Sequence, residues 1–122
     1  MIPNVAALED IIKDLCQEDA CIIVEGKRDV SALAYLGIPK GRILEAAQIT
    51  YSTLEGRIRQ KEYQKLVPLF DNDRTGENRM AGFMSYFSGG DMTIYESYSR
   101  RTKRAGLACI EELDNILERC RN

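Results

Sequence analysis

The segment at residues 66–78, LVPLFDNDRTGEN, is the part of the chain most suited to chemistry, because an apolar run ends directly in two aspartates. Asp71 and Asp73 stand one residue apart at the end of an expected strand. Carboxylates held this close raise each other's pKa unless a cation lies between them. Mg²⁺ takes oxygen ligands of this kind. The pair therefore predicts either a magnesium site or an acidic turn whose aspartates cap a helix.

A third carboxylate, Glu25, closes an earlier apolar run, ACIIVEG at residues 20–26. Ligands in open α/β sheets bind beyond the carboxyl ends of the strands. If the two strands are neighbours, Glu25, Asp71 and Asp73 converge at one edge of the sheet. Alone, Glu25 would be read as an exposed acid at a strand end. The three acids together favour a site for a divalent cation.

Composition narrows the remaining chemistry, because the 122 residues contain no histidine. This removes Ser-His-Asp and Cys-His catalysis and histidine-based zinc sites. The four cysteines have no CxxC spacing, and we expect buried free thiols rather than a zinc site. A net charge of −2 argues against coating nucleic acid by bulk charge, although a local basic strip is compatible with it. With no signal peptide and no apolar run of membrane-span length, we expect a cytoplasmic protein without membrane contact.

The spacing of apolar residues predicts helices alternating with strands over a single domain, residues 1–122. Ser52 and Glu55 form an expected capping box for one helix, and the basic run at 99–106, SRRTKRAG, is expected to be a loop. Each crossover is long enough for a parallel connection. We therefore expect an α/β fold with a four-stranded parallel sheet flanked by helices on both faces. The expected helices are about 4–17, 27–37, 52–63, 75–90 and 107–120, and the expected strands are 20–26, 41–46, 65–70 and 92–97.

DNDRTGENRMAG, residues 71–82, shares features with two other kinds of acidic loop. A calcium-binding EF-hand requires a glutamate at the twelfth position, where this chain has Gly82, and a helix rather than a strand before the loop. We reject it. The haloacid-dehalogenase-type phosphatases open with DxDxT after a strand, and Asp71, Asp73 and Thr75 match. The later lysine and acidic pair of that family find no good match, so it remains a remote alternative.

VEGKRDVSAL and LFDNDRTGEN together resemble the motifs of the Toprim domain over about residues 20–100. Toprim is the Rossmann-like catalytic module of topoisomerases, bacterial primases and the nuclease that matures 5S ribosomal RNA. Its first motif ends a strand in glutamate and glycine, as Glu25 and Gly26 do. Its second ends a strand in DxD with a glycine three residues on, as at Gly76. Thr75 stands where the DxDREGE pattern of type IA topoisomerases has an acid, so the resemblance does not imply a full two-metal site.

The resemblance implies that Asp71 and Asp73 hold Mg²⁺, with Mn²⁺ as a substitute, and that Glu25 is a general acid/base or a further metal ligand. It implies a metal-dependent nuclease of the ribosomal-RNA-maturation type acting on RNA or single-stranded DNA. The alternative is a non-catalytic nucleic-acid-binding module of a larger complex. The oligomeric state, monomer or homodimer, stays open.

Basic residues near the expected site could bind phosphate. Tyr95 and Tyr98, beside the basic run, could stack with bases. Each basic residue alone could equally be solvated surface charge. With the glycines Gly26 and Gly76, the expected phosphate and nucleic-acid contacts are Lys27, Arg28, Arg74, Arg100, Arg101, Lys103 and Arg104.

Overall fold

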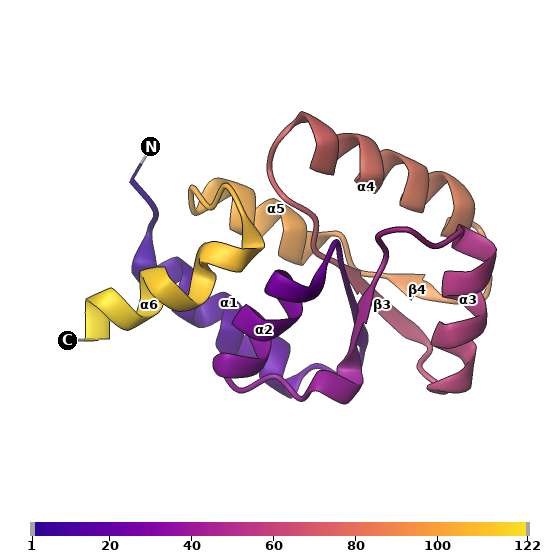
Figure 1. Cartoon of the computed structure of the whole chain (residues 1–122), viewed down its shortest axis with the longest axis horizontal. Helices are drawn as coiled ribbons and strands as arrows, with labels where there is room; N and C mark the ends of the chain where they lie inside the picture. Colours follow the sequence, from indigo (N-terminus) through magenta and orange to yellow (C-terminus); the bar gives the residue numbers. More distant parts are fainter. Residues whose placement is uncertain (1, 122) are drawn as a thin grey trace.

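The computed structural model describes residues 2–121 and contains a four-stranded parallel sheet with helices on both faces, as expected (Figure 1). The strands are short, and the two central ones are almost fully buried, which is typical of a parallel sheet covered on two sides. Their bounds are β1 Cys21–Val24, β2 Ile43–Glu45, β3 Lys65–Pro68 and β4 Thr93–Ile94. The helices are α1 Val5–Gln17, α2 Lys27–Tyr35, α3 Tyr51–Gln60, α4 Arg74–Phe87, α5 Ser97–Arg104 and α6 Leu113–Arg121, with short 3₁₀ turns η1 Lys40–Arg42 and η2 Ile110–Glu112.

The strand order β2-β1-β3-β4 places β1 and β3 side by side at the centre. Ile22 pairs with Ile43 of β2 on one side and with Val67 of β3 on the other. The chain thus leaves β1 toward β2 and later returns to the opposite side of β1. This reversal creates a topological switch point between β1 and β3, where ligands bind in open α/β sheets.

Two hydrophobic clusters cover the two faces of the sheet. One joins α1, α2, α5 and α6 to alternate residues of the central strands, such as Ile22, Val24 and Val67. The other joins α3 and α4 to the residues between them, such as Ile23 and Leu66. Figure 1 shows α3 and α4 toward the right of the sheet and α1, α2 and α6 toward the left. Successive side chains of a strand point to opposite faces of the sheet, so neighbouring residues of the buried central strands belong to different clusters.

Several expected elements differ from the structure. The basic run expected to be a loop is helix α5, ended by Gly106 at φ 81°. The expected tail helix, 107–120, starts later, because residues 107–112 form an extended segment and η2 before α6. Thr50, rather than Ser52, caps α3 by accepting a hydrogen bond from the Thr53 amide.

The free thiols are less buried than expected. Cys21 is buried, but Cys16 is exposed and Cys109 is partly exposed, while the Cys120 side chain lies outside the part of the chain that the structure describes. Cys16 lies on the outer face of α1, away from the row formed by Leu8, Ile12 and Leu15. No helix in residues 2–121 has the length and apolar composition needed to cross a membrane.

Candidate functional site

Glu25 and Asp71 line the same cavity, of about 310 Å³, at the carboxyl edge of β1 and β3. The two strands stay in register up to this edge, where the Leu69 amide donates to the Ile23 carbonyl at 2.8 Å. Each acid follows its strand within a few residues, so the switch point brings them together although 46 positions separate them in sequence. We call this space the carboxylate cavity.

Asp71 is held by a residue that lies outside the two sequence motifs, Ile110. Its Oδ1 accepts a hydrogen bond from the Ile110 amide at 3.0 Å, and the residue is half-buried. Burial raises the pKa of the Asp71 carboxyl, the Ile110 amide lowers it, and the charges of Glu25, Asp73 and Glu111 raise it further. A carboxylate has about four lone-pair positions, so this single bond leaves Asp71 with capacity to bind a cation.

Asp73 has the capping role that was one of the two interpretations of the acidic pair. It is the N-cap of α4, and its Oδ1 accepts from the Gly76 amide at 2.8 Å. The side chain is exposed and lies beside Asp71 rather than in the lining of the carboxylate cavity. Capping uses one oxygen and leaves the second oxygen available, so the cap and a metal-binding role are compatible.

Glu25 has a partner that the sequence did not reveal. Arg79 Nε of α4 donates to Glu25 Oε1 at 2.9 Å, and both side chains are partly exposed. A guanidinium has five N–H donors, so this contact through one edge leaves others for a phosphate. Residues 54 positions apart meet here only because α4 lies beside the end of β1.

Asp29 and Glu111 also line the carboxylate cavity and were absent from the expected site. Asp29 is 6% exposed and accepts from the Gly26 amide at 3.0 Å, closing the first turn of α2. Burial raises its pKa above the usual value, and Asp71, Glu111 and Glu25 add to the rise. An acid three residues after Gly26 is a sequence signal for such a cap, whereas nothing in the sequence placed Glu111 here.

The expected phosphate-binding residues fall into separate groups. Gly26, Lys27 and Arg28 line the carboxylate cavity at the start of α2. Arg74 is exposed in the first turn of α4. Arg100 and Lys103 lie on another side of Asp71, in a pocket between α4 and α5.

The remaining members of the basic run face α1 instead. Arg101 forms an ion pair with Asp14 at 2.9 Å, and Arg104 lines a depression with Arg101 and residues of α1. Tyr98 is 6% exposed and its hydroxyl donates to Glu18, so the expected stacking role for Tyr98 is wrong. Tyr95 is partly buried against the hydrophobic cluster beneath α1, α2, α5 and α6. Because α5 is a helix, the basic residues point to two different faces. Arg100 and Lys103 face the aspartate loop, and Arg101 and Arg104 face α1.

The oxygen donors of this edge suit a hard divalent cation. Across the described residues, no group of three or more acids and thiols is close enough to hold a metal ion by itself. Mg²⁺ is usually held by one or two carboxylates, with water and substrate phosphates completing its shell. Asp71 with Asp73 or Glu25 meets that smaller requirement. Burial and the neighbouring acids together raise the pKa of Asp71, and a bound cation would offset both effects.

Asn72 fastens the aspartate loop to the segment after α5. Its amide donates to the Ala108 carbonyl at 2.8 Å, and its side-chain Nδ2 donates to the Leu107 carbonyl at 2.7 Å and to Thr102 Oγ1 at 3.3 Å. Thr102 is 1% exposed and donates onward to the Ser99 carbonyl. This network holds residues 107–110 in place, and with them the Ile110 amide that binds Asp71.

We expect Asn72→Ala to lower Mn²⁺ affinity about tenfold, the usual loss when a supporting hydrogen bond to a metal ligand is removed. The variant also loses about 1–2 kcal/mol of stability, because it leaves buried acceptors unpaired. Calorimetric titration with Mn²⁺ well below the unfolding temperature measures the first effect. Asn78→Ala, an exposed asparagine of α4, is the control and should bind Mn²⁺ as the native protein does. Unchanged affinity in Asn72→Ala would show that the network does not position Asp71.

Comparisons with known proteins find similar sequences and a similar solved structure. No protein-family model matches the chain. A UPF0292 protein of Thermococcus onnurineus (strain NA1) is 26% identical over 113 residues, which cover 93% of this chain and 83% of that protein. A UPF0292 protein of Pyrococcus abyssi (strain GE5 / Orsay) is 29% identical over 116 residues, covering 93% and 86%. The solved structure of a protein from Aquifex aeolicus aligns with a TM-score of 0.79 at 26% identity, over 86% of this chain and 96% of that one. The chain is thus similar in sequence to UPF0292 proteins and in fold to the Aquifex protein.

Proposed function

We propose that the protein is a Toprim-type, metal-dependent phosphodiesterase that cleaves RNA or single-stranded DNA, in the manner of the ribosomal-RNA maturation nuclease. The observation that carries this proposal is the meeting of Glu25 and Asp71 in one cavity at the switch point between β1 and β3. The resemblance of the two motifs supplies the class of reaction. The free thiols of Cys16 and Cys109 fit a reducing compartment, so we infer a cytoplasmic protein.

Asp71 and Asp73 would hold Mg²⁺ or Mn²⁺, with Glu25 as a further ligand or as the acid/base. When bound, the ion supplies Lewis-acid polarisation of a phosphate oxygen and a more acidic water. Glu25 lines the cavity beside Asp71 and would take or return a proton at the scissile phosphate. Lys27 and Arg28 open α2 at the same cavity, where amide N–H groups and the helix dipole favour an anion.

Arg79 adds a role that the sequence did not suggest. Its contact with Glu25 sets the direction of that carboxylate, and its remaining N–H groups can donate to a phosphate oxygen. The same ion pair is the observation that favours the second candidate, a non-catalytic nucleic-acid-binding module, because Arg79 occupies Glu25 Oε1, an oxygen that a metal ligand or an acid/base would use.

Incubation with end-labelled structured RNA and single-stranded DNA, in Mg²⁺, in Mn²⁺ or in chelator, tests the proposal. We expect cleavage with either ion and none with chelator. Tight binding without cleavage under all three conditions would support the binding module instead. Release of phosphate from small phosphate esters, with a phosphorylated Asp71, would support the remote DxDxT phosphatase and contradict the phosphodiesterase.

A further inference from the structure

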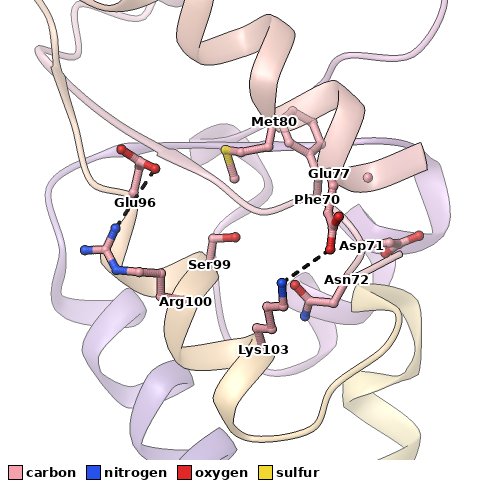
Figure 2. Close-up of a pocket in the computed structure, with 10 residues that line it drawn as sticks. Phe70, Asp71, Asn72, Glu77, Met80, Glu96, Ser99, Arg100 and Lys103 are labelled. Carbon is pink, nitrogen blue, oxygen red and sulfur yellow. Dashed lines mark hydrogen bonds and ion pairs between the residues drawn. The ribbon is translucent and has the colours of Figure 1, made fainter. Parts of the chain in front are cut away.

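A second pocket, of about 200 Å³, lies between α4 and α5 on the other side of the aspartate loop from the carboxylate cavity. Figure 2 shows the Asp71 carboxylate directed away from the middle of this pocket, while the Ser99 hydroxyl lies between Arg100 and Lys103. Asp71 lines both spaces. A molecule seated in this pocket would therefore lie next to whatever occupies the carboxylate cavity. We call it the α4–α5 pocket.

The pocket has an apolar wall. Phe70, the last residue before Asp71, is 3% exposed and belongs to the hydrophobic cluster beneath α3 and α4. Met80 of α4 is partly buried and packs against that cluster. Because Phe70 is almost fully covered, Met80 supplies most of the accessible apolar surface, and its flexible, polarisable thioether can pack against a flat ring. The volume lies below the range typical of sites for drug-sized ligands, so the pocket suits one ring system rather than a base pair.

The rim carries cations whose present partners hold them weakly. Lys103 Nζ lies 3.3 Å from Glu77 Oε1, and Arg100 lies 4.0 Å from Glu96. The four side chains are between 44% and 65% exposed, and exposed ion pairs contribute little to stability. A phosphate can therefore replace either glutamate without a large loss. The pocket is lined by two cations, Arg100 and Lys103, and by three acids, Asp71, Glu77 and Glu96, so a phosphate binds here by displacing a glutamate from its cation.

We propose that the α4–α5 pocket is a nucleotide subsite, in which one base of a single strand packs against Met80 while its phosphate pairs with Lys103 or Arg100. The proposal rests on the proposed function and deepens it, because it assigns a place to the nucleotide next to the scissile phosphate. A subsite for one unstacked base favours single-stranded over duplex substrates.

The test is to titrate the protein, in the presence of chelator, with each of the four ribonucleoside 5′-monophosphates, with ribose 5-phosphate and with inorganic phosphate. Changes in the NMR chemical shifts of the backbone amides report where each compound binds and how tightly. We expect at least one nucleotide to shift the amides of Asn72, Ser99 and Lys103, with an affinity at least about ten times that of ribose 5-phosphate. If ribose 5-phosphate bound as tightly as the nucleotides, the base would contribute nothing to binding, and the nucleotide subsite would be wrong. Shifts confined to Lys27 and Arg28 would place the ligand in the carboxylate cavity and overturn it.

Two variants and a control sharpen the result. Ser99→Leu fills the pocket and Lys103→Gln, at an exposed position, removes a rim cation, so both should weaken nucleotide binding about tenfold. Arg57→Gln removes the same charge from an exposed position of α3 and should bind as the native protein does. Unchanged binding in Lys103→Gln and Ser99→Leu would contradict the subsite.

Because the titration contains no metal, it is independent of cleavage. Nucleotide binding in a protein that never cleaves nucleic acid would uphold the subsite and refute the phosphodiesterase. Metal-dependent cleavage without nucleotide binding in this pocket would do the reverse.

Discussion

Replacing Asp71 by asparagine is expected to reduce metal-dependent cleavage about a thousandfold or more while leaving the protein folded. A bound ion contributes several kcal/mol to transition-state stabilisation, and each ~1.4 kcal/mol corresponds to a factor of ten in rate. Asparagine keeps the shape of the side chain and its carbonyl oxygen can still accept from the Ile110 amide. The loss would therefore report on the charge of Asp71. Initial cleavage rates and Mn²⁺ titration measure it.

The same variant should be more stable than the native protein at neutral pH. Burial and neighbouring acids raise the folded-state pKa of Asp71 above its usual 3.8. An acid with a raised folded pKa binds its proton more tightly in the folded state. Its ionisation therefore removes stability as the pH rises from about 3.8 through the folded pKa. Asparagine avoids this loss, so the melting temperature of Asp71→Asn should exceed that of the native protein at pH 7. The excess should shrink as the pH falls through the folded pKa and should be gone below about 3.8.

Asp19→Asn is the matched control, because Asp19 is an exposed acid just before β1, at the opposite edge of the sheet. It should cleave at the native rate. If Asp71→Asn instead lost stability at pH 7 and retained cleavage, Asp71 would be a structural acid that holds the segment after α5 rather than a metal ligand.

Gly76→Ala is expected to cost about 3 kcal/mol, the upper part of the usual range for overpacking, or about 10 °C in melting temperature for a domain of this size. Gly76 is buried in the first turn of α4 and lies against the Asp71 backbone. An added Cβ would collide with the Asp71 carbonyl oxygen and lie 2.7 Å from its carbonyl carbon. Backbone cannot move aside as a flexible side chain can, so α4 must shift away from the aspartate loop. Metal binding should fall with stability, because the shift moves Asp73 relative to Asp71.

Gly56→Ala provides the opposite result within the same chain. Gly56 lies in α3 with nothing within 4 Å of an added Cβ, so alanine should stabilise the protein by about 0.5–1 kcal/mol through helix propensity. Thermal unfolding of the two variants makes the comparison. A Gly76→Ala protein as stable as Gly56→Ala would mean that the loop and α4 are not packed as closely as the structure shows.

The sequence was sufficient to predict the strands and most helices, because these depend on local periodicity. The continuous apolar run at β1 and the i, i+3, i+4, i+7 spacing in α4 are signals carried by neighbouring residues. Gly76 was also recognised from the sequence as part of a motif. The sequence did not show why glycine is needed there, which is the close contact with the Asp71 backbone. Helix α5 was missed because its strongly basic composition resembles a solvated loop more than an amphipathic helix.

The sequence by itself therefore determined that Glu25, Asp71 and Asp73 stand at strand ends, since that follows from where apolar runs stop. Only the tertiary structure decided that β1 and β3 are neighbours, and hence that Glu25 and Asp71 share a cavity. It also decided which residues hold them: Arg79 on Glu25, and Ile110 on Asp71. These contacts join positions 54 and 39 residues apart. No local pattern encodes such pairs, because they form only when separate helices pack on the same edge of the sheet.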